Sequence, residues 1–407
     1  MNGNLGKIIK LNRKQLNLKQ DYLSCKAKIS KSYLSRLERN KEKISFDVAK
    51  KIFNVMDLRI SNEDIYEKFE YDFWMFYQDV AFNYDIDASY QRLQSYSSYI
   101  KSTTSYPKYL LGEMIFKIIY FNMTDVSTYH YLENYFEYLE NYQIQLYYMY
   151  LGIAFRKKKM HKEALEMYRL AERNVGNDVS NSMLYYHISI VLQNLNILSE
   201  SYDYIQKAKQ LFVDTLNLRR LVLSEFQIAI IETSRNNYEK GIKIYSSCIK
   251  AFEQLNMITQ IKDTYNNLLW TYIKSKQFDQ ILHLEDEVLN VVGENHSIYF
   301  FLSYTYYIKG DMAMAKKYIK LAKESLYQPT VYMEATIKAF SVLLSKSSLE
   351  RKEKYLKEAY RCAILNQDRD VEIFSLQLLI DFYLQNDHHQ DAIVYQQRLL
   401  ECYKEKC

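Results

Sequence analysis

The stretch YLGIAFRKKKMHKEALEMYRLA, residues 150–171, decides the fold of this chain. Apolar residues recur at helical spacing on both sides of the basic segment RKKK, a pattern that predicts two helices joined by a short turn. Three small residues would let the helices approach closely, and three large ones would fill the gaps around them: Gly152, Ala164 and Ala171, then Leu151, Phe155 and Tyr168. We therefore expect a closely packed pair of helices here.

This pattern resembles the tetratricopeptide repeat. The position of Ala164 recurs at intervals of 34 to 40 residues, at Ser201, Gly241, Ile281, Ala315, Tyr355 and Ala392. Helices are also predicted over 63–82, 86–100, 108–121 and 126–141. Stacked helix pairs form a right-handed superhelix with a concave inner face, and the resemblance implies that a peptide or protein binds there.

The composition also predicts an all-α chain. Its 407 residues include only 2 Pro and 8 Gly, whereas strand-rich folds need frequent turn residues. The five Cys show no CxxC spacing, so neither a disulfide framework nor a zinc site is indicated, and reduced thiols point to the cytoplasm. We find no signal peptide at the start and no run of about 18 apolar residues, and so expect no membrane span.

No catalytic or cofactor motif is evident. The chain has neither GxGxxG nor a phosphate-binding GK[ST] loop, and its seven His suggest no nucleophilic arrangement. His388, His389 and Asp391 contain the side-chain types of a metal site, but they are more typical of an exposed turn between two helices. We expect no enzyme activity, no cofactor and no bound metal.

Charge is unevenly distributed along the chain. Residues 1–58 contain 14 Lys and Arg against 5 Asp and Glu, a net charge of +9, which leaves −4 of the total +5 for the remainder. A small basic segment before a mildly acidic body indicates a polyanionic partner for that segment alone.

Residues 1–58 also contain the signals of four short helices. The second is predicted over Leu18–Cys25, and Ser30 and Ser45 would begin the third and fourth. Apolar residues would face inward at Leu5, Ile8, Ile9 and Leu16 in the first helix, Leu34 and Leu37 in the third, and Val48, Ala49, Ile52 and Phe53 in the fourth. The second and third helices are joined by only a few residues, which is helix-turn-helix geometry.

The segments LGKIIKLNRKQLNLKQDYL, residues 5–23, and ISKSYLSRLERNKEKIS, residues 29–45, resemble the Cro/repressor type of helix-turn-helix domain. The resemblance implies binding of double-stranded DNA and places Gln20 on a phosphate. One departure is Lys28, which replaces the usual turn Gly and would cost roughly 1 kcal/mol in a left-handed conformation.

The third helix would then read the major groove. Its outward residues Lys31, Ser32, Ser35 and Arg36 would face the bases, and Arg39, Lys41 and Lys43 would lie beside the phosphate backbone. Taken without the flanking helices, the same segment is equally consistent with an ordinary helix whose basic face is exposed to solvent.

Peptide-binding positions are predicted on the first helix of each repeat, which lines the concave face. They are Tyr150, Lys157, His187, Asn194, Gln227, Asn267, Trp270, Lys274 and Tyr304. Asn and Gln pair with both the N–H and the C=O of a bound backbone, and Lys157 or Lys274 would take a terminal carboxylate. The alternative for Trp270 is packing between neighbouring repeats.

A Cro-type domain followed by such repeats resembles the RRNPP quorum-sensing regulators of Gram-positive bacteria and their phages. The resemblance implies a cytoplasmic homodimer that binds a short signalling peptide and thereby repositions two DNA-binding domains. We expect a DNA-binding domain over 1–58, a linker over 59–70, and a repeat domain over 71–407 for peptide binding and dimerisation. Two alternatives are a repeat domain that binds a protein such as a response regulator, and a repressor without a ligand.

Overall fold

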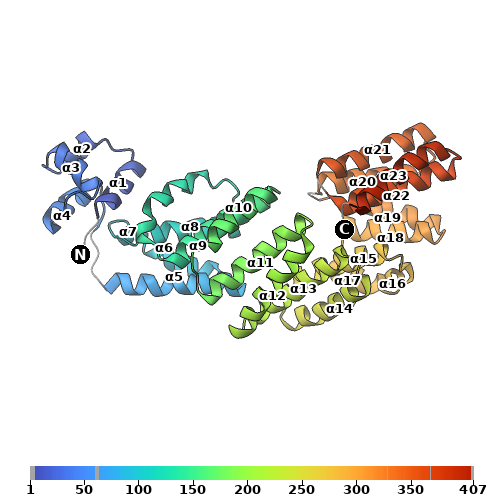
Figure 1. Cartoon of the computed structure of the whole chain (residues 1–407), viewed down its shortest axis with the longest axis horizontal. Coiled ribbons are helices and arrows are strands. Elements are labelled where there is room, and N and C mark those ends of the chain that lie inside the picture. Colours follow the sequence, from blue (N-terminus) through green and yellow to red (C-terminus); the bar gives the residue numbers. More distant parts are fainter. Residues whose placement is uncertain (1–4, 60–63, 328, 367, 405–407) are drawn as a thin grey trace. The chain divides into compact units, whose positions relative to one another are not determined.

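Every regular element in the described part of the chain is a helix (Figure 1). The computed structural model describes residues 5–59, 64–327, 329–366 and 368–404. The chain divides into two compact units, unit 1 over 1–224 and unit 2 over 225–407. The prediction of an all-α fold is confirmed.

Unit 1 holds the first twelve α-helices, one 3₁₀ helix and the start of α13. Their bounds are α1 Leu5–Gln15, α2 Gln20–Lys26, α3 Lys31–Glu38, α4 Phe46–Val55, α5 Asp64–Phe82, α6 Asp87–Ser95, α7 Ser97–Ile100, α8 Tyr106–Tyr120, η1 Ser127–Tyr138, α9 Asn141–Lys157, α10 His161–Glu172, α11 Asp178–Asn194, α12 Leu198–Asp214 and α13 Leu218–Ser234. The helix α5 begins inside the predicted linker 59–70, of which residues 60–63 lie outside the described residues.

Unit 2 takes up the end of α13 and continues as a run of helices. Their bounds are α14 Tyr238–Gln254, α15 Ile258–Lys274, α16 Phe278–His283, α17 Glu285–Val292, α18 His296–Ile308, α19 Met312–Glu324, α20 Val331–Leu343, α21 Leu349–Leu365, α22 Arg369–Gln385 and α23 His389–Lys404.

The helices α1 to α4 pack around one apolar core. Its buried members include seven of the ten predicted inward residues: Leu5, Ile9, Leu34, Leu37, Ala49, Ile52 and Phe53. Val48 packs against this core but is only partly buried, and Ile8 is buried outside it. The hydroxyls of Ser30 and Ser45 accept hydrogen bonds from the backbone N–H of Tyr33 (3.1 Å) and Val48 (3.4 Å), so both predicted N-caps are confirmed. Leu16 was predicted wrongly. It follows the end of α1 and is 47% exposed, because the chain turns away at the next residue.

The repeat register is confirmed in most helix pairs. Six marker residues each lie three positions after the first residue of the second helix of their pair: Ala164, Ser201, Gly241, Ile281, Ala315 and Ala392. Each of the six is buried. Tyr355 is the exception, because α21 begins six residues before it and buries Leu356 and Ala359 instead.

Close helix packing depends on glycine at two of these pairs. A Cβ atom at Gly152 in α9 would lie 2.4 Å from the ring of Tyr168 in α10. At Gly241 in α14 it would lie 2.3 Å from the methyl group of Thr233. No other residue type fits at these distances without movement, which is the close approach expected from the small residues of the repeat.

Candidate functional site

The helix α3 presents its predicted base-reading residues to solvent. Lys31, Ser32 and Arg36 are exposed, and Ser35 is half-buried. The Lys31 ammonium lies 2.8 Å from a carboxylate oxygen of Asp21, at the start of α2. The Arg36 Nε lies 2.7 Å from a carboxylate oxygen of Glu42, beyond the end of α3. Exposed pairs of this kind contribute only about 0–1 kcal/mol, so both cations can exchange their carboxylates for DNA at little cost.

Behind this surface, a buried ion pair joins α1 to α3. Arg13 donates from Nε and Nη2 to the two carboxylate oxygens of Glu38 at 2.6 and 2.8 Å. The hydrogen bond to Glu38 raises the pKa of Arg13. The Gln20 amide, predicted to meet a phosphate, donates to Glu38 at 2.7 Å. Sequence reasoning missed Arg13, although the Glu that closes the recognition helix was a signal for a buried partner.

The predicted phosphate-contacting residues lie at the end of α3. Arg39 donates to the carbonyl oxygen of Ser35 at 3.0 Å and to its hydroxyl at 3.1 Å, and its side chain is exposed. Lys41 and Lys43 are exposed in the loop before α4. This arrangement leaves all three cations reachable by a phosphate backbone.

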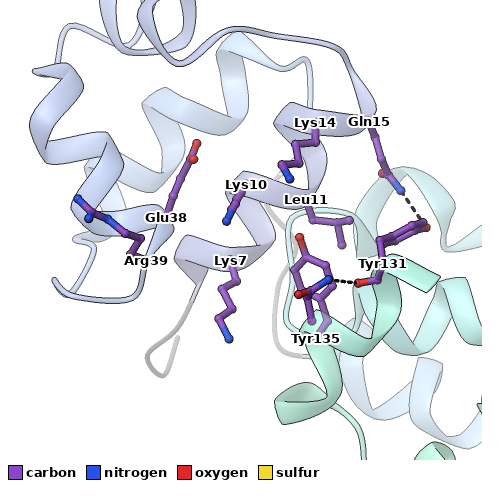
Figure 2. A pocket seen from close by; sticks show the side chains of 10 residues that line it. Lys7, Lys10, Leu11, Lys14, Gln15, Glu38, Arg39, Tyr131 and Tyr135 are labelled. Carbon is purple, nitrogen blue, oxygen red and sulfur yellow. Dashed lines mark hydrogen bonds between the residues drawn. The ribbon is translucent and has the colours of Figure 1, made fainter. Parts of the chain in front are cut away.

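A basic cavity of about 550 Å³ lies between α1 and the 3₁₀ helix η1 of unit 1 (Figure 2). Its lining includes Lys7, Lys10, Lys14 and Arg39, together with Tyr131, Asn134 and Tyr135 of η1. Gln15 donates to the Tyr131 hydroxyl at 3.3 Å, a contact that Figure 2 marks with a dashed line. The wall of the cavity therefore combines cations of the helix-turn-helix segment with aromatic side chains of η1.

The predicted peptide-binding residues of unit 1 differ in accessibility. Tyr150 and His187 are buried, whereas Asn194 is exposed at the last residue of α11. The Lys157 ammonium donates to the carbonyl oxygen of Ile118 and, at 2.7 Å, to the side chain of Asn122. Burial lowers the pKa of Lys157, and the charge of the neighbouring Arg156 lowers it further.

In unit 2, two of the predicted residues belong to an aromatic cluster. The ring of Trp270 in α15 lies 5.6 Å from Phe301 and 5.5 Å from Phe374, centre to centre. Tyr304 in α18 is buried, with its ring 4.9 Å from that of Phe374. This geometry favours packing between repeats, the alternative considered for Trp270.

The remaining unit 2 residues are polar. Gln227 is buried, and its amide nitrogen has no hydrogen-bond partner among the described residues. Asn267 is half-buried and donates to the carbonyl oxygen of Asp263 at 2.8 Å. The Lys274 ammonium lies 2.8 Å from a carboxylate oxygen of Asp370 and is largely buried. Of these three side chains, Gln227 is the one with a buried polar atom that lacks a partner among the described residues.

Unit 1 also contains a set of polar side chains that sequence reasoning did not bring together, which we call the buried polar cluster. It comprises Tyr77 of α5, Tyr150 and Arg156 of α9, Tyr168 of α10, His187 of α11 and Arg220 of α13. Burial raises the pKa of Tyr168 to about 12 and lowers that of His187 well below its usual value, which keeps the imidazole neutral. The one sign of this cluster in the sequence was the position of Arg156 in α9, a helix rich in tyrosine.

In the described residues no three or more His, Cys, Asp or Glu side chains gather as a metal site would require. None of the described helices is both long and apolar enough to cross a membrane. The side chain of His388 lies 3.7 Å from that of Asp391, and both are exposed.

Comparison with known proteins gave matches to both parts of the chain. Residues 9–61 match the helix-turn-helix family HTH_3. Over 352 residues the chain is 20% identical to the transcriptional activator NprA of Geobacillus stearothermophilus, covering 81% of this chain and 86% of NprA.

Two solved structures share the fold over most of the chain. A Rap protein in complex with competence and sporulation factor has a TM-score of 0.64 at 16% identity, covering 84% of this chain and 99% of that one. The apo form of the quorum sensor NprR from B. thuringiensis has a TM-score of 0.62 at 14% identity, covering 83% of this chain and 99% of that one. The predicted combination of a helix-turn-helix domain with a helical-repeat superhelix is confirmed.

Proposed function

We propose that this chain, which has the two-part architecture of the RRNPP regulators, is a DNA-binding transcriptional regulator whose repeat domain binds a short signalling peptide. One observation carries the proposal: a helix-turn-helix domain with an exposed basic α3 precedes a repeat fold shared with a quorum sensor and with a Rap protein solved in complex with competence and sporulation factor. The same proposal makes the chain a cytoplasmic homodimer without enzyme activity. It assigns residues 1–58 to DNA binding, 59–70 to a linker, and 71–407 to the repeat domain.

On DNA, α3 would point its N-terminal end, capped by Ser30, into the major groove. Lys31 would leave Asp21, and Arg36 would leave Glu42, to donate to guanine or phosphate oxygens. Two copies of α3 in a dimer would have to lie about 34 Å apart, one turn of the double helix. A change in that separation alters DNA affinity without any change in the reading residues.

In the repeat domain, a bound peptide would favour one curvature of the superhelix. Curvature is a sum of small rotations between neighbouring repeats, so tightening at several repeats displaces the ends of the array. A ligand that prefers one curvature shifts the population of dimers that can bind DNA. The amide of Gln227 and the half-buried Asn267 are the side chains of unit 2 best suited to a peptide backbone.

The test is a thermal-shift screen with synthetic peptides encoded beside the gene, followed by DNA binding with and without each peptide. We expect one peptide to raise the melting temperature of the full chain and to change its affinity for its operator. Asn267→Ala should remove the effect of the peptide and leave DNA affinity unchanged. If no peptide has either effect, a repressor without a ligand becomes the better account, and if a second protein co-purifies, the protein-partner alternative does.

A further inference from the structure

The buried polar cluster of unit 1 is incomplete as folded. Five of its buried atoms have no partner at normal hydrogen-bond geometry among the described residues: the hydroxyl oxygens of Tyr77, Tyr150 and Tyr168, Nδ1 of His187 and Nε of Arg156. The Arg156 guanidinium lies close enough to the Tyr168 hydroxyl to offset part of the rise in its pKa that burial causes, but the two groups leave Nε of Arg156 unpaired. Buried polar groups are nearly always paired, because an unpaired one costs about 1–3 kcal/mol. Five such atoms in one place indicate a missing partner rather than a local defect.

The side chains of the cluster come from five helices and influence one another electrostatically. The rings of Tyr168 and His187 are stacked with their centres 6.3 Å apart. His187 is close enough to Arg156 and Arg220 for both charges to lower its pKa, after the larger effect of burial. Arg220 in turn partly offsets the rise in the pKa of Tyr77 and Tyr150 that their burial causes.

The cluster is cationic and has no acidic residue. Arg220 donates to the backbone carbonyl oxygens of Ala81 at 2.8 Å and Val80 at 3.0 Å, not to a carboxylate. Neither Arg220 nor Arg156 forms a salt bridge within the described residues, although both are partly buried. Two partly buried guanidinium groups without a counter-charge repel each other and lose hydration, so the unliganded site is destabilised.

The chemistry of the unpaired groups selects the ligand. Arg donates only, and its planar group suits a carboxylate. A Tyr hydroxyl can donate to the same oxygens, and a neutral imidazole has one N–H to donate. The two lysines first assigned to a carboxylate are already engaged, Lys157 with Asn122 and Lys274 with Asp370. The free capacity therefore lies with Arg156 and the tyrosines.

We propose that the buried polar cluster binds a carboxylate group of the peptide, with Arg156 as its principal partner and Tyr150, Tyr168 and His187 as further donors. This inference rests on the proposed peptide binding and specifies its chemistry. The carboxylate is either the C-terminus of the peptide or an Asp or Glu side chain within it.

The first test needs no ligand and compares two arginines of unit 1 in the full-length chain. Arg156→Met removes an uncompensated charge and should raise the melting temperature of the unliganded protein by about 2–4 °C. The matched control is Arg169→Met in α10, whose guanidinium lies 2.8 Å from Glu172 and 3.1 Å from Glu200, and it should not raise the melting temperature. If Arg156→Met lowers the melting temperature as much as the control, Arg156 is structural and the inference is overturned.

The second test uses three pools of random hexapeptides: one with free C-termini, one amidated, and one amidated without Asp or Glu. A C-terminal ligand predicts a rise in melting temperature with the first pool alone. A side-chain ligand predicts a rise with the first two. In either case Arg156→Met should weaken the response at least about tenfold, since a hydrogen bond to a charged group contributes about 1.5–3 kcal/mol.

Two results would overturn the inference here: equal shifts from all three pools, or an undiminished response in Arg156→Met. If no pool shifts the wild-type protein, the proposed peptide binding fails. In that case the melting temperatures of unliganded Arg156→Met and Arg169→Met still test the cluster. A failure of peptide binding can therefore be told apart from a failure of the inference about the cluster.

Discussion

Replacing Arg13 by Met should unfold the DNA-binding domain selectively. The change removes two hydrogen bonds to Glu38 and one of 2.8 Å to the carbonyl oxygen of Leu18. It leaves the Glu38 side chain, only 1% exposed, with the single donor Gln20. Removing one member of a buried pair costs about 3–5 kcal/mol, because the other charge remains buried without compensation.

That cost is as large as the whole stability expected of this domain. A core formed by fewer than about 70 residues rarely supplies more than about 3–5 kcal/mol. In Arg13→Met we therefore expect loss of operator binding, while the repeat helices stay folded. Native-state hydrogen exchange should show protection of the α3 amides reduced by about 10²–10⁴-fold, the factor that corresponds to this free energy.

Two further variants identify the cause. Arg39→Met removes an exposed arginine whose side-chain hydrogen bonds go to Ser35, and should change the free energy of unfolding by no more than about 0.5 kcal/mol. The double variant Arg13→Met/Glu38→Leu should recover most of the lost protection, because no charge is left buried. The reasoning is refuted if Arg13→Met costs less than about 1 kcal/mol, or if the double variant is no more stable than the single one.

Three more outcomes can be checked in separate experiments. Arg36→Ala should weaken operator binding by about 10–100-fold more than binding to random DNA, and an equal loss in gel-shift assays on both would mean that Arg36 touches only phosphate. Gly152→Ala forces a Cβ atom against the buried ring of Tyr168 and should cost about 1–3 kcal/mol in thermal unfolding. Gly112→Ala, whose Cβ would have its nearest neighbour at 3.3 Å, is the control and should be close to neutral. Because burial lowers the pKa of His187 in the folded state, its contribution to stability is complete above about pH 6.5 and is lost as pH falls below that value. In His187→Asn the decline in melting temperature between about pH 6.5 and 5 should be shallower, and an unchanged slope would exclude His187 as its source.

Much of the candidate DNA-binding surface could be predicted from local sequence pattern. The cap at Ser30, the turn through Lys28 with its left-handed φ of 58°, and the exposed face of α3 all depend on residues within a few positions of one another. The ion pairs formed by the exposed cations of α3 could not be predicted from local pattern. Lys31 meets Asp21, ten residues earlier, only because the turn folds α2 against α3.

The repeat domain shows the same division. Its register followed from the spacing of small residues and failed only at Tyr355, where α21 begins earlier than in the other pairs. The side chains of its interior were harder to assign, since a polar residue on a helix has no visible partner in sequence. Trp270 proved to lie against Phe374, more than 100 residues later in the chain.

By itself, the sequence determined the helical fold class, the two-part organisation and the residues that α3 exposes, because helical periodicity, capping and the approach of small residues are local properties. Only the tertiary structure decided which charges are compensated. It paired Arg13 and Lys274 with carboxylates and gave Lys157 neutral acceptors, and among the described residues it left Arg156 and Arg220 without a carboxylate in a group of buried tyrosines. Compensation of a charge depends on distances between helices that are far apart in the chain, and no local spacing encodes them.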